Sequence, residues 1–125
     1  WPGHIKPGVA EAMISQVDFL RTLATLAGAE VPPGAGLDSH DVLPALLGEK
    51  TVGRETLVEQ GGGVMLGLRK GNWKFIPRPN AKNSELYDLA SDPGETKNVA
   101  GENAAVVKEM AGLLGASRAL GNGAP

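Results

Sequence analysis

Glycine and proline interrupt this chain so often that they limit the length of any helix or strand it can form. The sequence contains 18 glycines and 9 prolines among 125 residues, about twice the combined frequency of these residues in average proteins. Proline lacks a backbone donor and glycine favours turns, so both interrupt regular structure. We therefore expect short helices and strands that are joined by many turns.

The rest of the composition narrows the class of protein. Hydrophobic residues make up 42% and charged residues 21% of the chain, which is typical of a globular domain and not of a disordered tail. The sequence has no cysteine, which excludes disulfides, thiolate metal sites and cysteine nucleophiles from it. It has 12 lysines and arginines and 14 aspartates and glutamates. This lack of a basic excess argues against a nucleic-acid partner. No apolar run approaches the roughly 20 residues of a membrane-spanning helix, so no membrane partner is expected.

The first predicted helix has clear start and stop signals. Ser15 and Asp18 match the pattern of a capping box, in which each side chain covers the backbone amide of the other. Apolar residues then repeat at helical spacing, and Gly28 stands where a left-handed residue ends a helix. These signals predict a helix over residues 16–27.

Two further helices are expected. A short helix over residues 41–47 would be capped by Asp38 or Ser39 and would end at Gly48. Asn103 precedes an apolar stripe at helical spacing, which predicts a C-terminal helix.

Strand-forming residues gather in four segments, which are residues 55–60, 64–70, 73–77 and 85–89. Gly71 and Asn72 between the second and third segments are the signal for a two-residue hairpin turn. That turn sets the register of the two strands and pairs Arg69 with Lys74. The same alternation directs a set of apolar side chains towards the core, namely Leu66, Leu68, Trp73 and Phe75.

Positive charge is concentrated between residues 61 and 84, where no acidic residue occurs. The five basic residues are Arg69, Lys70, Lys74, Arg78 and Lys82. One interpretation is an anion-binding face for sulfate esters, phosphates, an acidic glycan or nucleic acid. The other, which we favour, is a solvated hairpin on which a carboxylate such as Asp88 or Glu55 offsets the repulsion between Arg69 and Lys74.

Other motifs point more weakly to chemistry. The run Gly61-Gly62-Gly63 lacks the Gly-Lys-Ser/Thr ending of a phosphate-binding loop and is interpreted as a connection between strands. The run Asp92-Pro93-Gly94 is typical of a turn. Asp38, His40 and Asp41 place three potential metal ligands within four residues, although such residues before a helix usually act as caps. From the residues alone, we predict a small α/β domain without a recognisable active site.

Several short motifs gain meaning from their order along the chain. They are Trp1-Pro2-Gly3, Lys6-Pro7-Gly8, Ser15-Gln16-Val17-Asp18, Leu43-Pro44-Ala45-Leu46-Leu47-Gly48, Leu68-Arg69-Lys70-Gly71-Asn72-Trp73-Lys74-Phe75-Ile76, Glu85-Leu86-Tyr87-Asp88-Leu89 and Asp92-Pro93-Gly94-Glu95. This collinear set runs from residue 1 to about residue 107 and resembles the C-terminal third of the sulfatase family, in the alkaline-phosphatase-like superfamily.

The resemblance implies an α+β (α/β) fold. A small antiparallel sheet of about four strands would pack against a C-terminal helix, with an N-terminal helix from the end of the large sulfatase domain. Residues 1–50 would be the end of that large domain and residues 51–125 a C-terminal subdomain. In the family, this subdomain supports the catalytic domain and lends loops to the rim of the substrate pocket. The loop after Gln60 and the loop over residues 77–84 are the expected rim, and the candidate residues are Gln60, Arg69, Lys74 and Arg78.

The resemblance also implies that the parent protein hydrolyses sulfate esters. In the family, the nucleophile is a formylglycine made from the first residue of a Cys/Ser-x-Pro-x-Arg motif, and it lies beside a calcium ion. Both belong upstream of the matched region, and the motif does not occur in this chain. We therefore assign no catalytic residue, metal ligand or cofactor here, and we predict that the chain is inactive alone.

The expected partners follow from this interpretation. The chain begins at Trp1-Pro2-Gly3, which we interpret as the start of a fragment whose partner is a missing N-terminal catalytic domain. The wide apolar face of helix 16–27 would pack on that domain or join two copies as a dimer. The substrate of the parent would be a sulfated small molecule or sugar, and a bacterial-type parent would be periplasmic or secreted. The alternative is a stand-alone anion-binding or interaction module that uses residues 61–84.

Overall fold

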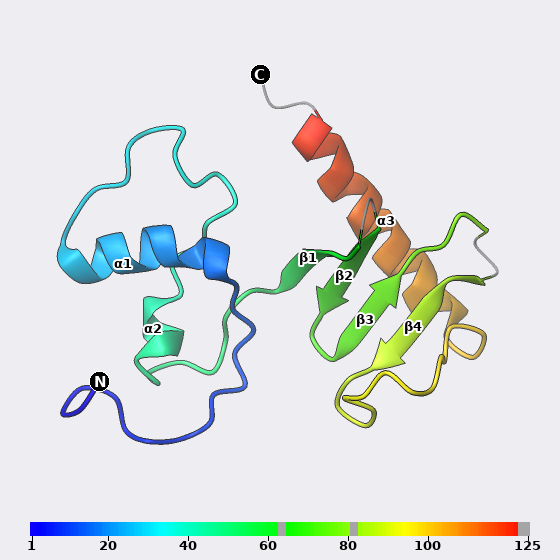
Figure 1. Ribbon diagram of the computed structural model, residues 1–125, viewed down its shortest axis with the longest axis horizontal. Coiled ribbons are helices and arrows are strands. Elements are labelled where there is room, and N and C mark those ends of the chain that lie inside the picture. Colours follow the sequence, from blue (N-terminus) through cyan, green and yellow to red (C-terminus); the bar gives the residue numbers. More distant parts are fainter. Residues whose placement is uncertain (63–64, 81–82, 123–125) are drawn as a thin grey trace. The chain divides into compact units, whose positions relative to one another are not determined.

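The computed structural model describes residues 1–62, 65–80 and 83–122 of the chain. The chain divides into two compact units, Trp1–Glu55 and Thr56–Pro125, whose helices and strands are labelled in Figure 1. In the described part of the chain, no helix combines the length and the apolar character that crossing a membrane requires. The assignment of residues 1–50 to a large domain and residues 51–125 to a subdomain stays a prediction.

Unit 1 contains the predicted first helix. A single 3-10 turn, η1 (Gln16–Asp18), leads directly into α1 (Phe19–Ala27), so the helix expected over residues 16–27 is confirmed with a tighter first turn. The Ser15 amide donates a hydrogen bond to Asp18 Oδ2 at 2.9 Å, as expected for the acidic half of a capping box. Gly28 ends the helix with a φ of 67°, in the left-handed region.

The second helix of unit 1, α2 (Leu43–Leu46), is shorter than predicted and has a different cap. The prediction that Asp38 or Ser39 caps it is wrong, because its N-cap residue is Val42, whose side chain makes no capping hydrogen bond. Asp41 Oδ1, which precedes the cap, accepts a hydrogen bond from the Leu43 amide at 3.0 Å. The Ser39 side chain is buried, and its hydroxyl accepts a hydrogen bond from the Arg21 amide of α1. Ser39 thus connects the loop to α1 and is not free to cap α2.

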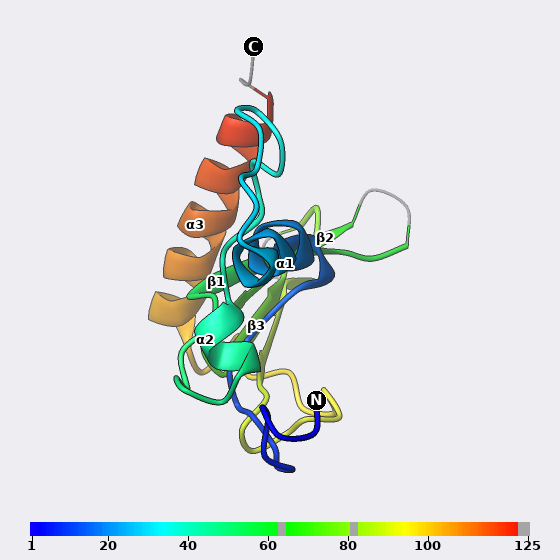
Figure 2. The same ribbon diagram turned by 90° about the vertical axis from the view of Figure 1, so that its left-hand side faces the viewer.

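Unit 2 is an antiparallel sheet with one helix on it. Its strands are β1 (Thr56–Gln60), β2 (Leu66–Lys70), β3 (Trp73–Ile76) and β4 (Glu85–Asp88), in that order across the sheet. The predicted hairpin register is confirmed, because Arg69 lies opposite Lys74 and Lys70 lies opposite Trp73. The helix α3 (Ala104–Asn122) lies along one face of the sheet (Figures 1 and 2). The expected α+β fold is therefore confirmed.

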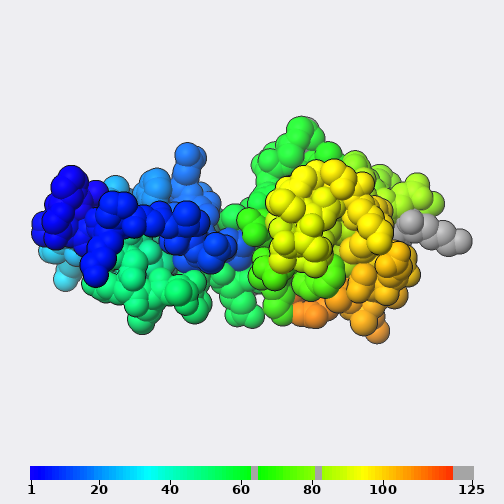
Figure 3. All heavy atoms as spheres, turned by 90° about the horizontal axis from the view of Figure 1, so that it is seen from below, coloured from blue at the N-terminus to red at the C-terminus, as the bar shows by residue number. Residues whose placement is uncertain are grey.

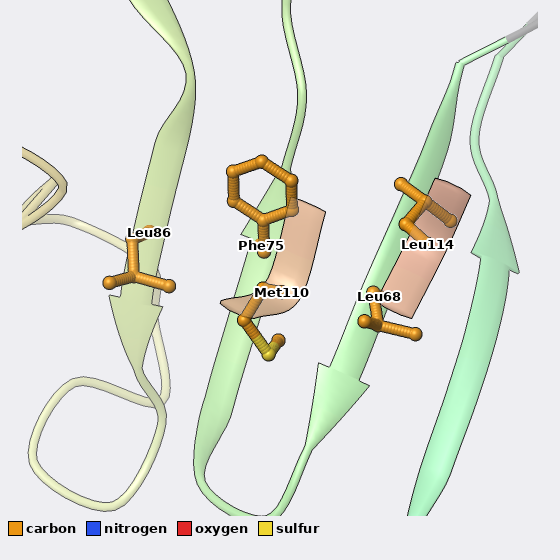
Figure 4. Packing of buried hydrophobic residues seen from close by; sticks show 5 residues of the cluster. All are labelled: Leu68, Phe75, Leu86, Met110 and Leu114. Carbon is orange, nitrogen blue, oxygen red and sulfur yellow. The ribbon is translucent and has the colours of Figure 1, made fainter. Parts of the chain in front are cut away.

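The core of unit 2 lies between the sheet and α3. Its fully buried members are Leu68, Phe75, Leu86, Met110 and Leu114 (Figure 4). Leu66 and Trp73 pack against this cluster while remaining partly exposed, so the face predicted from strand alternation is confirmed. Each fully buried side chain of this size stabilises the fold by about 1.5–3 kcal/mol.

The segment between β4 and α3 covers the outer edge of β4. The Leu86 amide donates to Asn98 Oδ1 at 3.1 Å, and the Leu86 carbonyl accepts from the Val99 amide at 2.9 Å. The segment begins with the predicted turn, in which Asp92 Oδ2 accepts from the amides of Thr96 and Lys97. Figure 3 shows it in yellow over the end of the sheet. Because an open strand edge invites pairing with other chains, this segment protects β4.

Candidate functional site

A cavity of about 400 Å³ lies in unit 2, where two loops and one helix meet. The β1–β2 loop contributes Gly62 and Met65, and the β3–β4 loop contributes Pro77, Arg78 and Pro79. Leu66 of β2 and Arg118 of α3 complete the lining. These are the two loops that the sequence marks as candidates for a substrate rim, and the fold brings them together at one end of the sheet.

Arg78 contacts Glu85 and Met65 at this cavity. Its Nε and Nη2 atoms donate to Glu85 Oε1 at 2.8 and 2.5 Å, and its Nη1 atom lies 2.9 Å from Met65 Sδ. The Tyr87 hydroxyl donates to the other carboxylate oxygen of Glu85 at 3.0 Å. Burial, followed by this contact with Glu85, raises the pKa of Tyr87. Tyr87 therefore remains a donor at neutral pH and helps to hold Glu85 against Arg78.

Arg118 is the second cation at the cavity, and the sequence analysis did not identify it. It lies on α3, four residues after the buried Leu114, and its side chain is exposed. No ion pair joins it to any residue within the described ranges. The signal that could have located it is helical spacing, because residues four positions apart share one face of a helix.

Lys74 lies on the face of the sheet that points away from α3, where two carboxylates neutralise it. Its Nζ atom is 2.7 Å from Glu95 Oε1 and 3.5 Å from Glu59 Oε2. The hydrogen bond with Glu95 is the main reason that the pKa of Lys74 is raised. Glu95 has a φ of 54°, and a left-handed backbone at a residue other than glycine costs about 1–2 kcal/mol. The contact with Lys74 offsets part of this cost.

The expected partners of the basic hairpin, Asp88 and Glu55, are not the observed ones. Asp88 lies opposite Trp73 in the β3–β4 register, so strand alternation directs its side chain to the face opposite that of Lys74. Asp88 instead accepts hydrogen bonds from Ala90 and Ser91 in the next turn. The prediction that a carboxylate lies beside the basic hairpin is correct, but the prediction that it is Asp88 or Glu55 is wrong, because the observed carboxylates are Glu59 and Glu95.

The remaining basic residues of the hairpin differ in their surroundings. Lys70 Nζ lies 2.5 Å from Glu109 Oε1 of α3. Arg69 shares the face of Lys74, and its buried Nε atom has no hydrogen-bond partner among the described residues. Lys82 lies outside the described residues. Carboxylates thus neutralise Lys70, Lys74 and Arg78. This favours the interpretation of a solvated hairpin whose positive charge is offset by carboxylates over that of an anion-binding face.

The four rim candidates therefore occupy different places. Arg78 lines the cavity, whereas Arg69 and Lys74 lie on the outer face of the sheet. Gln60 is the last residue of β1, is exposed, and immediately precedes the loop that contains Gly62. The structure brings only Arg78 of these four into the lining described around the cavity. Their role at a substrate rim stays a prediction.

A buried ion pair in unit 1 is the strongest electrostatic feature that the sequence analysis missed. Asp18 is fully buried, and Arg54 approaches it with Nε at 2.8 Å from Oδ2 and Nη2 at 2.6 Å from Oδ1. The His40 amide also donates to Asp18 Oδ1, at 2.9 Å. Burial by itself would raise the pKa of Asp18, but the hydrogen bonds from Arg54, His40 and Ser15 outweigh it and lower the pKa to about 2. The pair joins three segments of unit 1, because Asp18 also accepts from the His40 amide and Arg54 lies 36 residues further along the chain.

The described residues include no group of three or more histidine, aspartate or glutamate side chains that could hold a metal ion. Asp38, His40 and Asp41 are therefore adjacent in the sequence without forming a ligand set. The Asp38 carbonyl instead accepts a hydrogen bond from Arg54, and the His40 amide is bound to Asp18. Both contacts lie within unit 1 and are structural.

Comparison with known proteins gives relatives along nearly the whole chain, although no family model matches it. An N-acetylgalactosamine-6-O-sulfatase of Bacteroides thetaiotaomicron is 35% identical over 91% of this chain and 25% of its own length. Human arylsulfatase A is 34% identical over 88% of this chain and 27% of its own length.

A solved structure supports the same relationship. It is a Bacteroides thetaiotaomicron protein described in connection with the metabolism of multiple glycosaminoglycans, and it superimposes with a TM-score of 0.85 at 34% identity. The superposition covers 95% of this chain and 28% of that protein. The chain thus spans about a quarter of the length of the relatives it matches.

Proposed function

Because this chain belongs to the sulfatase family and corresponds to its C-terminal portion, we propose that it is the non-catalytic part of a sulfate-ester hydrolase. The observation that supports this proposal is that 91% of the chain matches a quarter of the length of a sulfatase, with 35% of the aligned residues identical. The chain has no cysteine and no Ser-x-Pro-x-Arg sequence. We therefore propose that the formylglycine nucleophile, together with the calcium ion that the family implies, belongs to the preceding part of the parent protein.

The first role we propose is to support that catalytic part. Several large apolar side chains of η1 and α1 are between 39% and 53% exposed, namely Val17, Phe19, Leu20, Leu23 and Leu26. A contiguous apolar surface of this kind usually marks a contact with another protein surface. We propose that it packs on the catalytic domain, with pairing between two copies as the competing outcome.

The second role is to shape the rim of the substrate pocket. The loops that carry Gly62 and Arg78 meet at a cavity with cationic and apolar lining, which suits a sugar that carries an anionic group. The related proteins are described as an N-acetylgalactosamine-6-O-sulfatase and in connection with glycosaminoglycan metabolism. A sulfated sugar is therefore the substrate class that we propose for the parent.

The decisive experiment restores the natural sequence upstream of Trp1 and assays hydrolysis of an aryl sulfate and of N-acetylgalactosamine 6-sulfate. We expect turnover from the longer protein and none from the 125-residue chain. Absence of turnover from a longer protein with an intact, matured Cys/Ser-x-Pro-x-Arg motif would refute the proposal.

A surface variant tests the supporting role separately. Because Leu23 is 53% exposed, Leu23→Lys should change the unfolding free energy of the isolated chain by no more than about 0.5 kcal/mol. In the longer protein, the same variant should lower the yield of active enzyme, whereas Lys108→Gln on α3 should not. Equal yields for both variants would exclude this face as the domain contact.

Binding experiments separate the sulfatase proposal from a stand-alone module. A module that uses the hairpin should bind heparin with a steep dependence on salt. That binding should be lost in the double variant Arg69→Ala/Lys74→Ala. Absence of heparin binding at low salt would remove this alternative.

A further inference from the structure

We propose that the cavity lined by Arg78 and Arg118 is a binding site for one singly charged anionic group, a sulfate ester or a carboxylate, carried by a sugar ring. The proposal rests on the proposed function only for the source of that sugar. The chemistry of the site is argued from the side chains themselves.

The charge of the cavity is the first argument. Glu85 neutralises Arg78 through two hydrogen bonds from the guanidinium group. Arg118 has no carboxylate partner among the residues that the structure describes. Among the described residues at the cavity, these three groups together leave one positive charge, which matches a monoanion such as a sulfate ester or a carboxylate.

The geometry of the two arginines is the second argument. Glu85 and the sulfur of Met65 contact the Arg78 guanidinium at the cavity, so part of its side-chain entropy is already lost before an anion binds. Arg118 reaches the same cavity from α3, 40 residues further along the chain. Arginine presents a planar fork of donors that matches the oxygens of sulfates and carboxylates. One ordered and one exposed guanidinium can therefore bind one anion together.

The size and the remaining lining are the third argument. A volume of about 400 Å³ lies within the range of small-molecule sites. Met65, Leu66, Pro77 and Pro79 supply apolar surface, which suits the C–H face of a pyranose ring. The loop at Gly62 leaves open space, because a Cβ atom placed there would meet no heavy atom within 4 Å. The cavity thus combines two cationic side chains with an apolar lining.

The test is a backbone-amide NMR titration of the 125-residue chain with three sugars that differ in one group. Galactose 6-sulfate carries a sulfate ester, galacturonic acid carries a carboxylate, and galactose carries neither. We expect saturable shifts at the amides of Gly62, Met65 and Arg118 with at least one of the anionic sugars and not with galactose. A response to the sulfated sugar alone assigns the site to sulfate esters, and a response to galacturonic acid alone assigns it to carboxylates.

Matched variants of α3 make the test specific. Arg118→Gln should weaken binding about tenfold or more, because a charge-assisted hydrogen bond is lost. Lys108→Gln removes the same charge from the same helix, away from the cavity lining, and should leave the affinity within about twofold. Arg118→Lys should retain part of the affinity through its charge.

Three results would overturn the proposal. They are the absence of any shift with both anionic sugars, an equal response to galactose, and equal losses in Arg118→Gln and Lys108→Gln. None of them depends on turnover by the longer protein. Failure of this site can therefore be distinguished from failure of the proposed sulfatase function.

Discussion

Replacing Asp18 with asparagine keeps the shape of the side chain but removes its charge from the buried contact with Arg54. The pKa of Asp18 is about 2 in the folded chain against an ordinary value of 3.8. Each pKa unit corresponds to 1.36 kcal/mol, so the charged form stabilises unit 1 by about 2 kcal/mol at neutral pH. The variant also leaves the Arg54 guanidinium, whose side chain is 9% exposed, without its partner. Breaking a buried pair costs about 3–5 kcal/mol, so the expected loss lies between about 2 and 5 kcal/mol.

The effect of this substitution should depend on pH with a definite sign. Because folding lowers the pKa of Asp18, its contribution is complete above the unfolded value near 4 and is lost as the pH falls through about 2. Below that pH, the carboxyl group of the wild-type chain is itself protonated. The wild-type chain and Asp18→Asn should therefore differ most at pH 7 and become similar near pH 2.

Hydrogen exchange of the α1 amides is the suitable assay, because it reports on unit 1 separately from unit 2. A loss of 2 kcal/mol corresponds to an increase in the exchange rate of about 30-fold. Asp38→Asn is the matched control, because Asp38 is exposed and only its backbone carbonyl contacts Arg54. The reasoning is refuted if Asp38→Asn has the same effect, or if the difference between Asp18→Asn and wild type persists unchanged at pH 2.

Three further predictions concern unit 2. Leu86→Ala should lower the unfolding free energy of unit 2 by about 2–5 kcal/mol, because Leu86 is fully buried. Val58→Ala on the partly exposed edge strand should lower it by clearly less. Hydrogen exchange of the sheet amides measures both changes. Asn98→Ala removes the acceptor of the Leu86 amide and should cost about 1–3 kcal/mol in the same measurement, so an unchanged exchange rate would contradict this role. Since the pKa of Lys74 is raised, mainly by its hydrogen bond with Glu95, this stabilisation is present below pH 10.5 and is lost as the pH rises past the folded pKa. Urea denaturation at alkaline pH should therefore show a smaller decline for Lys74→Met than for wild type, and equal declines would refute the contribution of this contact.

Local signals in the sequence determined most of unit 2. Gly71 and Asn72 are the only two residues between β2 and β3, so this turn determines the strand register and places Arg69 opposite Lys74. Once that register is set, the twofold alternation of a strand decides which side chains face α3. Gly28 similarly ends α1 where it was predicted, because glycine adopts the left-handed conformation at little cost. These features depend on residues that are neighbours in the chain.

Partners that are distant in the sequence could not be assigned in the same way. A carboxylate such as Asp88 or Glu55 was expected to offset the repulsion between Arg69 and Lys74. Lys74 instead pairs with Glu59 and Glu95. Glu59 reaches it because two successive registers, β1 with β2 and β2 with β3, place both side chains on one face. Glu95 reaches it through a loop whose path depends on its own turn and left-handed residue.

The candidate site was therefore predictable only in part. The sequence by itself indicated the sulfatase resemblance, the hairpin and the two loops that carry Gly62 and Arg78, because each depends on short motifs and their order. Only the tertiary structure joined Arg118 to that cavity and Arg54 to Asp18, across 40 and 36 residues. Turn chemistry and periodicity act over a few residues, whereas charges that meet across a fold are brought together by packing of the whole chain.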